Sequence, residues 1–235
     1  MTRSKLSSET LFNFTDSLEH LIDNLQNGIF CAYQYEKLPK RNNGYYIHMA
    51  CFCDIPLSMT DEHFNWYGRY GIGIKRSYAR ALGVRPVWYL TSENPIIGTI
   101  ISECKSGKPN RQILPFLKQF YGKQTYKTIQ KDGSSVKTDR YKKFYDEREW
   151  RYVPAESKLE PILGLKPGNL IKLMLDMKPL RMKLELESIE YIIVAADSDM
   201  KTLLIELEKI ATKSKYNYTK LVSRIITAKQ IERDF

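Results

Sequence analysis

The sequence predicts an α+β fold in a single domain spanning residues 1–235, with a mixed or antiparallel central sheet flanked by helices. Strand-like and helix-like segments alternate early and then give way to strands with irregular connections, so regular βαβ repetition is absent. The chain is 43% apolar and 12% aromatic, which is enough to build a core and excludes collagen, coiled-coil and wholesale disordered chains. No glycine-rich phosphate loop is present, which also favours α+β.

The N-terminal segment predicts a strand followed by a capped helix. Residues 11–15 (LFNFT) predict the strand, and Thr15 or Asp16 is expected to cap the helix. Apolar residues then recur at helical spacing: Leu18, Leu21, Ile22 and Leu25. Gly28 is expected to end the helix in the left-handed conformation.

Further short elements are predicted along the rest of the chain. Strands are expected at residues 45–53, 71–74, 86–90, 150–154, 169–174, 189–195 and 221–226. Helices are expected around His63, at 77–82, at 94–121 with an interruption at 106–110, at 200–212 and at the C-terminus. Residues 105–143 are interpreted as a basic surface excursion that could be mobile.

Positive charge is concentrated in one part of the chain. The formal net charge is +10, and residues 105–151 hold 13 basic and 5 acidic side chains. Such a field favours a polyanion, with nucleic acid first, and interleaved aromatic residues suit stacking on the bases of a single strand. The candidate contacts are Lys118, Lys123, Lys127, Arg140, Lys142 and Lys143. A solvated basic loop explains the same residues equally well.

Nothing in the sequence predicts export or membrane insertion. A run of about 18 apolar residues is absent, and the N-terminus lacks the apolar segment of a secretory signal. Four cysteines in 235 residues do not make a disulfide framework. We therefore expect a cytoplasmic protein.

The densest cluster of charged and aromatic side chains is residues 144–154 (FYDEREWRYVP). If Glu149 opens a strand, Glu147 and Arg151 point to its own side, and a glutamate beside arginine stays ionised. A positioned, ionised carboxylate can stabilise an oxocarbenium-like transition state. The alternative is a structural Arg–Glu pair beside the buried Trp150.

His48, Cys51, Cys53 and His63 offer the ligand types of a zinc site, but not a standard zinc spacing. Buried thiols in a core strand explain the cysteines more simply, so no metal is expected. His63 is interpreted as a satisfied surface or cleft histidine in preference to a catalytic base.

Aromatic residues gather between His63 and Gly71. Trp66, Tyr67 and Tyr70, with one arginine among them, could stack on a planar ring such as nicotinamide or a nucleobase. An aromatic core followed by a turn is the alternative.

Several familiar enzyme classes are disfavoured. The motifs of P-loop NTPases, HExxH zinc proteases and α/β-hydrolases are absent. Asp146 and Glu149 with Lys142 approximate a metal-dependent nuclease site only loosely.

Several segments together resemble AbiGi-type abortive-infection proteins, which belong to two-gene phage-defence systems. The resemblance is carried by residues 11–15, 51–57 (CFCDIPL), His63, 67–73 (YGRYGIG), Pro86, Val87, Tyr89 and 144–152 (FYDEREWRY). It implies a role in a toxin–antitoxin pair, since the family is described as the antitoxin half of a pair with a nucleotidyltransferase-type toxin.

The sequence also resembles, more weakly, the ADP-ribosyltransferase superfamily, in particular DarT-like enzymes that modify nucleic acid. This resemblance implies an ADP-ribosyltransferase-like fold and NAD as cofactor, although Asn13 stands where such motifs often have His. The resemblance implies that Glu149 is the catalytic acid, that Asn13 and Thr15 hold NAD, and that Tyr67 or Tyr70 stacks on the nicotinamide. From the clusters described above, Glu147 and Arg151 join the candidate catalytic residues, and His63 joins the candidate cofactor-binding residues.

Two functions therefore remain open. The first is an ADP-ribosyltransferase-like effector that uses NAD to modify nucleic acid or a nucleic-acid-associated target. The second is a non-catalytic antitoxin that neutralises a partner toxin. The first requires Asn13, Tyr67 or Tyr70, and Glu149 around one cleft with the basic surface at its mouth. A closed ion pair around Glu149, walled off from any opening, would exclude the catalytic role and leave only the resemblance to the phage-defence family.

Overall fold

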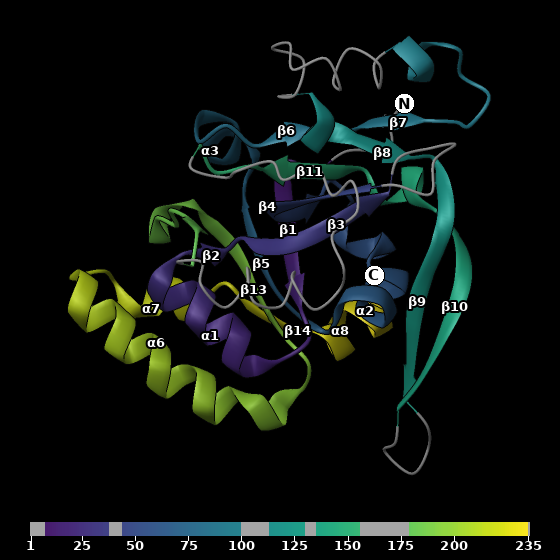
Figure 1. Cartoon of the computed structure of the whole chain (residues 1–235). Coiled ribbons are helices and arrows are strands. Elements are labelled where there is room, and N and C mark those ends of the chain that lie inside the picture. The colour runs from purple at the N-terminus through teal and green to yellow at the C-terminus, as the bar shows by residue number, and fades with distance from the viewer. Residues whose placement is uncertain (1–7, 38–43, 100–112, 130–134, 156–178, 235) are drawn as a thin grey trace, which may run out of the picture.

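A computed structural model of the chain contains an eight-stranded mixed sheet at its centre (Figure 1). The structure describes residues 8–37, 44–99, 113–129, 135–155 and 179–234. The sheet strands, in spatial order, are β14 (Ile225–Thr227), β13 (Ile189–Val194), β5 (Tyr70–Lys75), β1 (Thr10–Thr15), β4 (Gly44–Cys53), β11 (Glu149–Tyr152) and β6 (Arg85–Pro86), with β3 (Ala32–Lys37) paired to β4. β13 and β14 are parallel, and the other described pairings in this sheet are antiparallel. The predicted α+β class with a mixed sheet is confirmed.

Successive side chains of a strand point to opposite faces of the sheet, so both faces carry apolar residues. Helices pack on each of the two faces. Leu11 of β1 packs with α1 (Leu18–Asn27), α6 (Met200–Ser214) and α7 (Tyr218–Val222), which lie together in Figure 1. The next residue, Phe12, packs on the opposite face with α2 (Asp61–Tyr67) and α8 (Ala228–Asp234). Burial on both faces makes β1 a central strand.

The predicted first helix is present, but its cap differs from the prediction. Ser17, rather than Thr15 or Asp16, is the N-cap, and its side chain accepts a hydrogen bond from the backbone N–H of His20. Gly28 ends the helix with φ 88, as expected, and its N–H donates to Asn24 O. A Cβ atom at Gly28 would lie 2.6 Å from the Met182 carbonyl oxygen, so only glycine fits here.

A β-hairpin stands beside the sheet (Figure 1). It consists of β9 (Tyr121–Ile129) and β10 (Ser135–Lys143), paired in antiparallel register. Before it, β8 (Leu117–Gln119) pairs in parallel with β7 (Trp88–Leu90), and Leu117 lies in a small core beneath β4. The shorter elements are β2 (Ile29–Phe30), β12 (Arg181–Met182), α3 (Arg76–Ala81), and the 3-10 turns at Leu57–Met59, Leu114–Phe116, Phe144–Glu147, Leu186–Ser188 and Asp197–Asp199.

Three element predictions are wrong. The predicted helix over 94–121 does not extend through its second half, where a 3-10 turn at Leu114–Phe116 and then β8 are formed. The predicted strand 86–90 is divided between β6 and β7, which belong to different sheets. The predicted strand 221–226 begins as α7 and becomes β14 only at Ile225. The predicted strand 169–174 lies outside the described residues.

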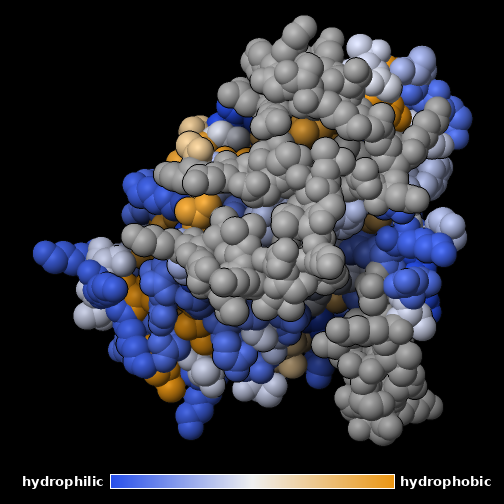
Figure 2. Space-filling model, viewed as in Figure 1, coloured by the Kyte–Doolittle hydropathy of each residue, from blue (hydrophilic) through white to orange (hydrophobic). Residues whose placement is uncertain are grey.

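Hydrophilic side chains cover much of the face shown in Figure 2, both over α6 and over the hairpin. Among the described residues, no helix combines the length and apolar character needed to cross a bilayer.

Candidate functional site

The acidic cluster predicted from residues 144–154 lies on and beside β11. Glu149 opens this strand opposite Cys53 of β4, and Arg151 lies opposite Cys51. Both side chains point to one side, as the alternation predicts, and they are 5% and 0% exposed. The backbone N–H of Glu149 donates to the hydroxyl of Tyr89 at 2.8 Å, which fixes the start of the strand.

A left-handed residue separates the two glutamates. Arg148 has φ 45 and ψ 51, a conformation that costs a non-glycine residue about 1–2 kcal/mol. Its N–H donates to Tyr145 O and its carbonyl accepts from Asp54 N, and these bonds hold the turn. Glu147, the last residue of the preceding 3-10 turn, and Glu149 therefore both reach Lys118.

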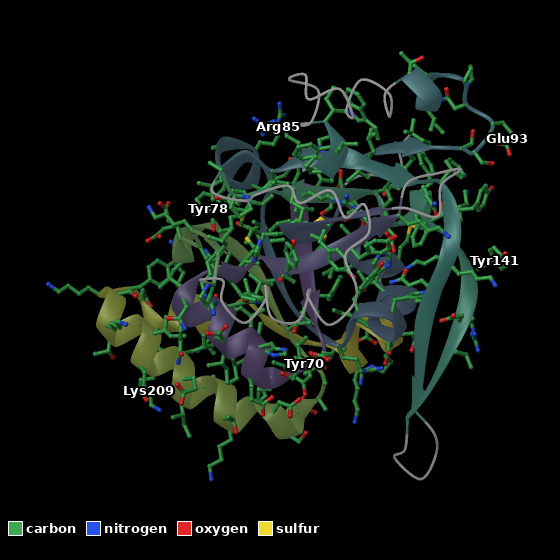
Figure 3. The ribbon with its side chains drawn as sticks, in the orientation of Figure 1. Tyr70, Tyr78, Arg85, Glu93, Tyr141 and Lys209 are labelled. Atoms are coloured by element: carbon green, nitrogen blue, oxygen red, sulfur yellow. The ribbon has the colours of Figure 1, made fainter. Side chains whose placement is uncertain are left out.

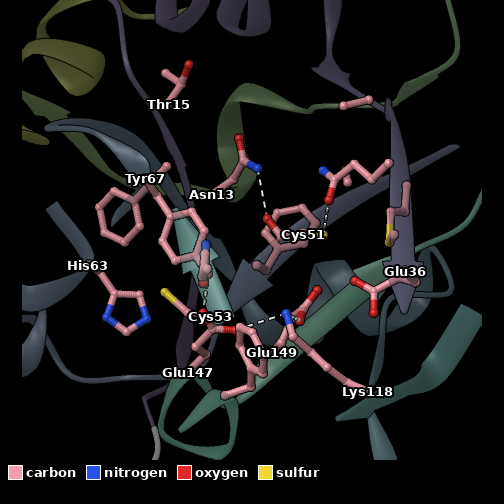
Figure 4. Close-up of a pocket in the computed structure, with 18 of the residues that line it drawn as sticks. Asn13, Thr15, Glu36, Cys51, Cys53, His63, Tyr67, Lys118, Glu147 and Glu149 are labelled. Carbon is pink, nitrogen blue, oxygen red and sulfur yellow. Dashed lines mark hydrogen bonds and ion pairs between the residues drawn. The ribbon is translucent and has the colours of Figure 1, made fainter. Parts of the chain in front are cut away.

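Three carboxylates and three cations form one network. Figure 4 shows its carboxylates, Glu36, Glu147 and Glu149, with Lys118 among them. Lys118 Nζ lies 3.0 Å from Glu147 Oε2 and 2.5 Å from Glu149 Oε2. The Arg151 guanidinium contacts Glu149 Oε1 at 2.7 Å, and it reaches Glu36 Oε1 of β3 at 2.8 Å. The other terminal nitrogen of the guanidinium, Nη1, donates to the Pro115 carbonyl oxygen at 2.6 Å.

The network continues into the hairpin and into α2. Lys142 of β10 places its ammonium 2.7 Å from Glu147 Oε1, and the hydroxyl of Tyr67 donates to the same oxygen. The Lys142 ammonium also lies over the rings of Trp66 and Tyr67, 4.3 and 4.6 Å from their centroids. The inner face of the hairpin is thereby fastened to α2.

Opposite charges favour the ionised forms of Glu149 and Lys118, whereas burial raises the pKa of Glu36. Burial alone would raise the pKa of Glu149, but Arg151 and Lys118 hold it far below the ordinary value. Burial alone would lower the pKa of Lys118, but Glu149 and Glu147 raise it well above its usual range. The contact of Glu149 with Arg151 agrees with the expectation of a glutamate that stays ionised beside arginine.

The network forms one wall of a cavity of about 1170 Å³. Asn13 and Thr15 from β1 and His63 and Tyr67 from α2 line the same space as Glu149 (Figure 4). The Asn13 amide is held by a bond to the carbonyl of Cys51 at 2.9 Å. Segments far apart in the sequence thus converge, as the sequence analysis required.

His63 is a cleft residue, but it is not the satisfied histidine that the sequence suggested. It is 6% exposed, and neither ring nitrogen has a hydrogen-bond partner among the described residues. Burial and the nearby Lys142 ammonium lower its pKa to about 4, so the ring is neutral near pH 7. A neutral imidazole brings one donor and one acceptor to the cavity wall.

Of the two cysteines of β4, Cys53 is buried and Cys51 is half-buried. Cys51 Sγ lies 3.7 Å from the Gln34 side-chain oxygen, and Cys53 Sγ lies 3.6 Å from the Phe12 carbonyl. Burial raises the pKa of both thiols well above the ordinary value. Within the described part of the chain, no three His, Cys, Asp or Glu side chains gather as a metal-binding group.

Tyr70 does not join the predicted site. Its hydroxyl donates to Asp199 at 3.1 Å, and its ring packs on the core beneath α1 and α6. Of the two predicted tyrosines, Tyr67 is therefore the one that lines the cavity with Asn13 and Glu149.

Five of the six predicted nucleic-acid contacts separate into two groups. Lys118 and Lys142 are only 12% and 10% exposed and serve as ion-pair partners in the network. Lys123, Arg140 and Lys143 are exposed on the hairpin. The side chain of Lys127 lies outside the described part of the structure.

Two participants were missed by the sequence analysis. Glu36 and Tyr89 were not singled out for chemistry, because a lone glutamate in a strand and a tyrosine in an apolar run carry no distinctive spacing. Only the pairing of β3 with β4 brings Glu36 to Arg151.

The chemistry available to Glu149 is restricted by its partners. Oε1 accepts from Arg151, while Oε2 accepts from both Lys118 and Arg151. A carboxylate held by two cations is a weak base, whereas the cavity beside it retains aromatic, amide and imidazole groups for binding.

The sequence matches a family model described as "Putative abortive phage resistance protein AbiGi, antitoxin" over residues 43–195. An alignment of 163 residues with an abortive phage resistance protein AbiGi of Lactococcus lactis subsp. cremoris shows 28% identity. This alignment covers 59% of this chain. The match covers 65% of the length of that curated relative. No solved structure matches the chain.

Proposed function

Because this chain belongs to the AbiGi family of abortive phage resistance proteins, we propose that it acts in abortive infection as an antitoxin, by binding rather than by catalysis. Its partner would be the nucleotidyltransferase-type toxin that the family resemblance implies. In this proposal the buried charge network gives the cavity and hairpin a fixed shape, and the protein neutralises its partner through contact.

The closed ion pairing of Glu149 is the observation that carries this proposal. The carboxylate that a transferase would direct at a ribose hydroxyl accepts hydrogen bonds from Arg151 and Lys118 instead. Truncating a buried ion pair is expensive, so such a pair is well suited to a structural role.

Co-expression tests the antitoxin role. The chain is expressed in bacteria alone and beside the toxin encoded next to it, and growth is followed. We expect the chain alone to leave growth unchanged and the pair to grow where the toxin alone arrests. Growth arrest by the chain alone contradicts the proposal.

A second candidate is an ADP-ribosyltransferase-like effector that uses NAD. Convergence of Asn13, Thr15, His63, Tyr67 and Glu149 on one cavity favours it. In this alternative Asn13 and Thr15 would hold the cofactor beside Tyr67, and the bound NAD would supply the ADP-ribosyl group.

NAD consumption separates the two candidates. Purified protein is mixed with labelled NAD and with DNA, RNA or bacterial lysate, and the products are resolved by mass. Consumption that Glu149→Gln abolishes in a folded variant supports the transferase and overturns a binding-only role. Unchanged NAD in all mixtures, together with growth rescue, supports the antitoxin.

A further inference from the structure

The outer face of the β9–β10 hairpin carries two tyrosines and two lysines in a diagonal arrangement. Tyr121 pairs with Lys143 across the hairpin, and Lys123 pairs with Tyr141. Directly paired residues and residues two apart on a strand point to the same side, so these four side chains share one face. The opposite face carries Gln124 and Lys142, which contact Tyr67.

The two tyrosines of this outer face are unusually exposed. Tyr121 is 61% exposed and Tyr141 is 79% exposed, and Figure 3 shows Tyr141 on the side of the hairpin away from the sheet. Each of the two lysines lies near aromatic rings. The Lys123 ammonium is 5.4 Å from the Tyr141 ring centroid, and that of Lys143 is 5.7 Å from the Tyr145 centroid.

Aromatic stacking extends from the hairpin to its base. The ring of Tyr145, 46% exposed, stacks on Phe120 with centroids 5.1 Å apart and an interplanar angle of 13°. Tyr89 meets the Tyr145 ring edge-on at 5.4 Å. Tyr121 also belongs to these aromatic contacts, since its ring centroid lies 4.7 Å from that of Phe120. Tyr121 and Tyr141 nevertheless keep most of their surface exposed.

Charge indicates the kind of partner. The two strands of the hairpin contain six basic residues and one acidic residue, a net +5 out of the chain's +10. One of these cations, Lys142, is neutralised by Glu147, and Lys143 makes an exposed pair with Asp146 at 3.0 Å. Exposed pairs are weak, so a phosphate can replace Asp146 beside Lys143 at little cost.

We propose that this outer face of the hairpin binds single-stranded nucleic acid, with Tyr121 and Tyr141 stacking on bases and Lys123 and Lys143 contacting phosphates. Diagonal positions in an antiparallel pair are about 7–8 Å apart. That spacing is about twice the 3.4 Å rise of a stacked strand, so the two rings can hold separate, splayed bases. Duplex bases are already stacked on one another and offer no such faces.

This inference goes beyond the antitoxin role and does not require it. Tyr121, Lys123 and Tyr141 also line the cavity, so a strand bound to them would lie beside it. The unpaired ring nitrogens of His63 lie inside the same cavity.

Fluorescence anisotropy with labelled oligonucleotides tests the proposal on the full chain. The probes are 20-residue oligo-dT, oligo-rU and a DNA duplex of the same length, titrated at several salt concentrations. We expect the single strands to bind more tightly than the duplex. Tyr121→Ala and Tyr141→Ala should each weaken single-strand binding by about five- to a hundred-fold.

Salt dependence separates stacking from phosphate contact. The double variant Lys123→Ala/Lys143→Ala should flatten the slope of log K against log salt by about 1.4, because each single-strand phosphate contact contributes about 0.7. Phe30→Ala and Lys209→Ala are the controls: Phe30 is an exposed ring beside a cation at 5.5 Å, and Lys209 is an exposed lysine on α6. Both should leave affinity within about two-fold.

Circular dichroism confirms that each variant is folded, which is expected because the four side chains are exposed. Equal binding of duplex and single strands, or affinity insensitive to both tyrosine variants, overturns the proposal. If the tyrosine variants bind oligonucleotides normally but lose the co-expressed toxin in a pull-down, the face is a protein interface and the proposal is wrong.

Discussion

Replacing Arg151 by methionine tests the central electrostatic argument. Arg151 is fully buried and holds Glu149, Glu36 and the Pro115 carbonyl. Methionine keeps much of the side-chain volume but removes the charge and every donor, so two carboxylates lose their guanidinium.

The expected loss of stability is large. Removing one partner of a buried ion pair costs about 3–5 kcal/mol, because the other charge stays buried without compensation. Arg69→Met is the matched control, since Arg69 and Glu232 are 32% and 35% exposed, and an exposed pair contributes only about 0–1 kcal/mol.

The loss of stability in the Arg151→Met variant should depend on pH. In the native chain the pKa of Glu149 is lowered, so its contribution to stability is fully present above its unfolded value of about 4.3 and is lost as the pH falls below it. Without Arg151, Glu36 loses its guanidinium partner and Glu149 keeps Lys118 but loses Arg151, so the pKa of both carboxyls rises and protonation costs less. The difference between variant and native protein should therefore shrink as the pH is lowered from 7 to 5.

Urea denaturation followed by tryptophan fluorescence measures both quantities. A Glu149→Gln/Arg151→Met double variant should recover part of the loss, because only Glu36 of the two carboxylates then still faces the missing guanidinium. A loss below about 1 kcal/mol at pH 7, or a difference that does not change with pH, would show that water or other cations already neutralise Glu149 and would refute the reasoning.

Three further predictions concern single residues. The NMR titration of His63 should have its midpoint near pH 4, and a midpoint near 6.5 would show that burial does not lower its pKa. Because the unfolded chain binds this proton more readily, the free energy of unfolding should fall by up to about 3 kcal/mol as the pH drops from 6.5 to 4. In thermal melts, Gly68→Ala should destabilise the protein by more than about 2 kcal/mol, because φ is +105 and neighbouring backbone atoms occupy the Cβ position. Gly83→Ala should cost about 1 kcal/mol, because φ is +94 but the space around the Cβ position is open. Equal losses in the two variants would exclude a steric clash at Gly68. Cys51 and Cys53 should react with iodoacetamide at pH 8 only after denaturant is added, and rapid labelling of the native protein would contradict their raised pKa.

The parts of the fold with one clear periodicity were predictable. The strand at 11–15 and the helix that follows could be identified because alternation, helical spacing and a stop glycine agree. The predicted helix at 94–121 failed because apolar residues such as Leu114 and Leu117 match a helical spacing, yet they are buried from a 3-10 turn and a short strand. A tertiary contact beneath β4 outweighs local periodicity there.

The site was predictable where its members lie close together in the sequence. Glu147, Glu149 and Arg151 share one segment, so strand alternation alone brings them together. Lys118 lies 31 residues from Glu149, and its burial depends on the parallel pairing of β7 with β8, which leaves no local signal. The sequence therefore predicted Lys118 as a surface residue, because its positive charge was the only signal there.

The position of Lys142 makes the hairpin part of the interior as well as of the surface. A chain shortened by excising residues 121–143 would keep its sheet residues but would leave the Glu147 carboxylate without one of its two ammonium partners. Loop trimming, a common route to smaller and better-behaved variants, is therefore poorly suited to this protein. Insertions belong at the far tip of the hairpin, away from Lys142.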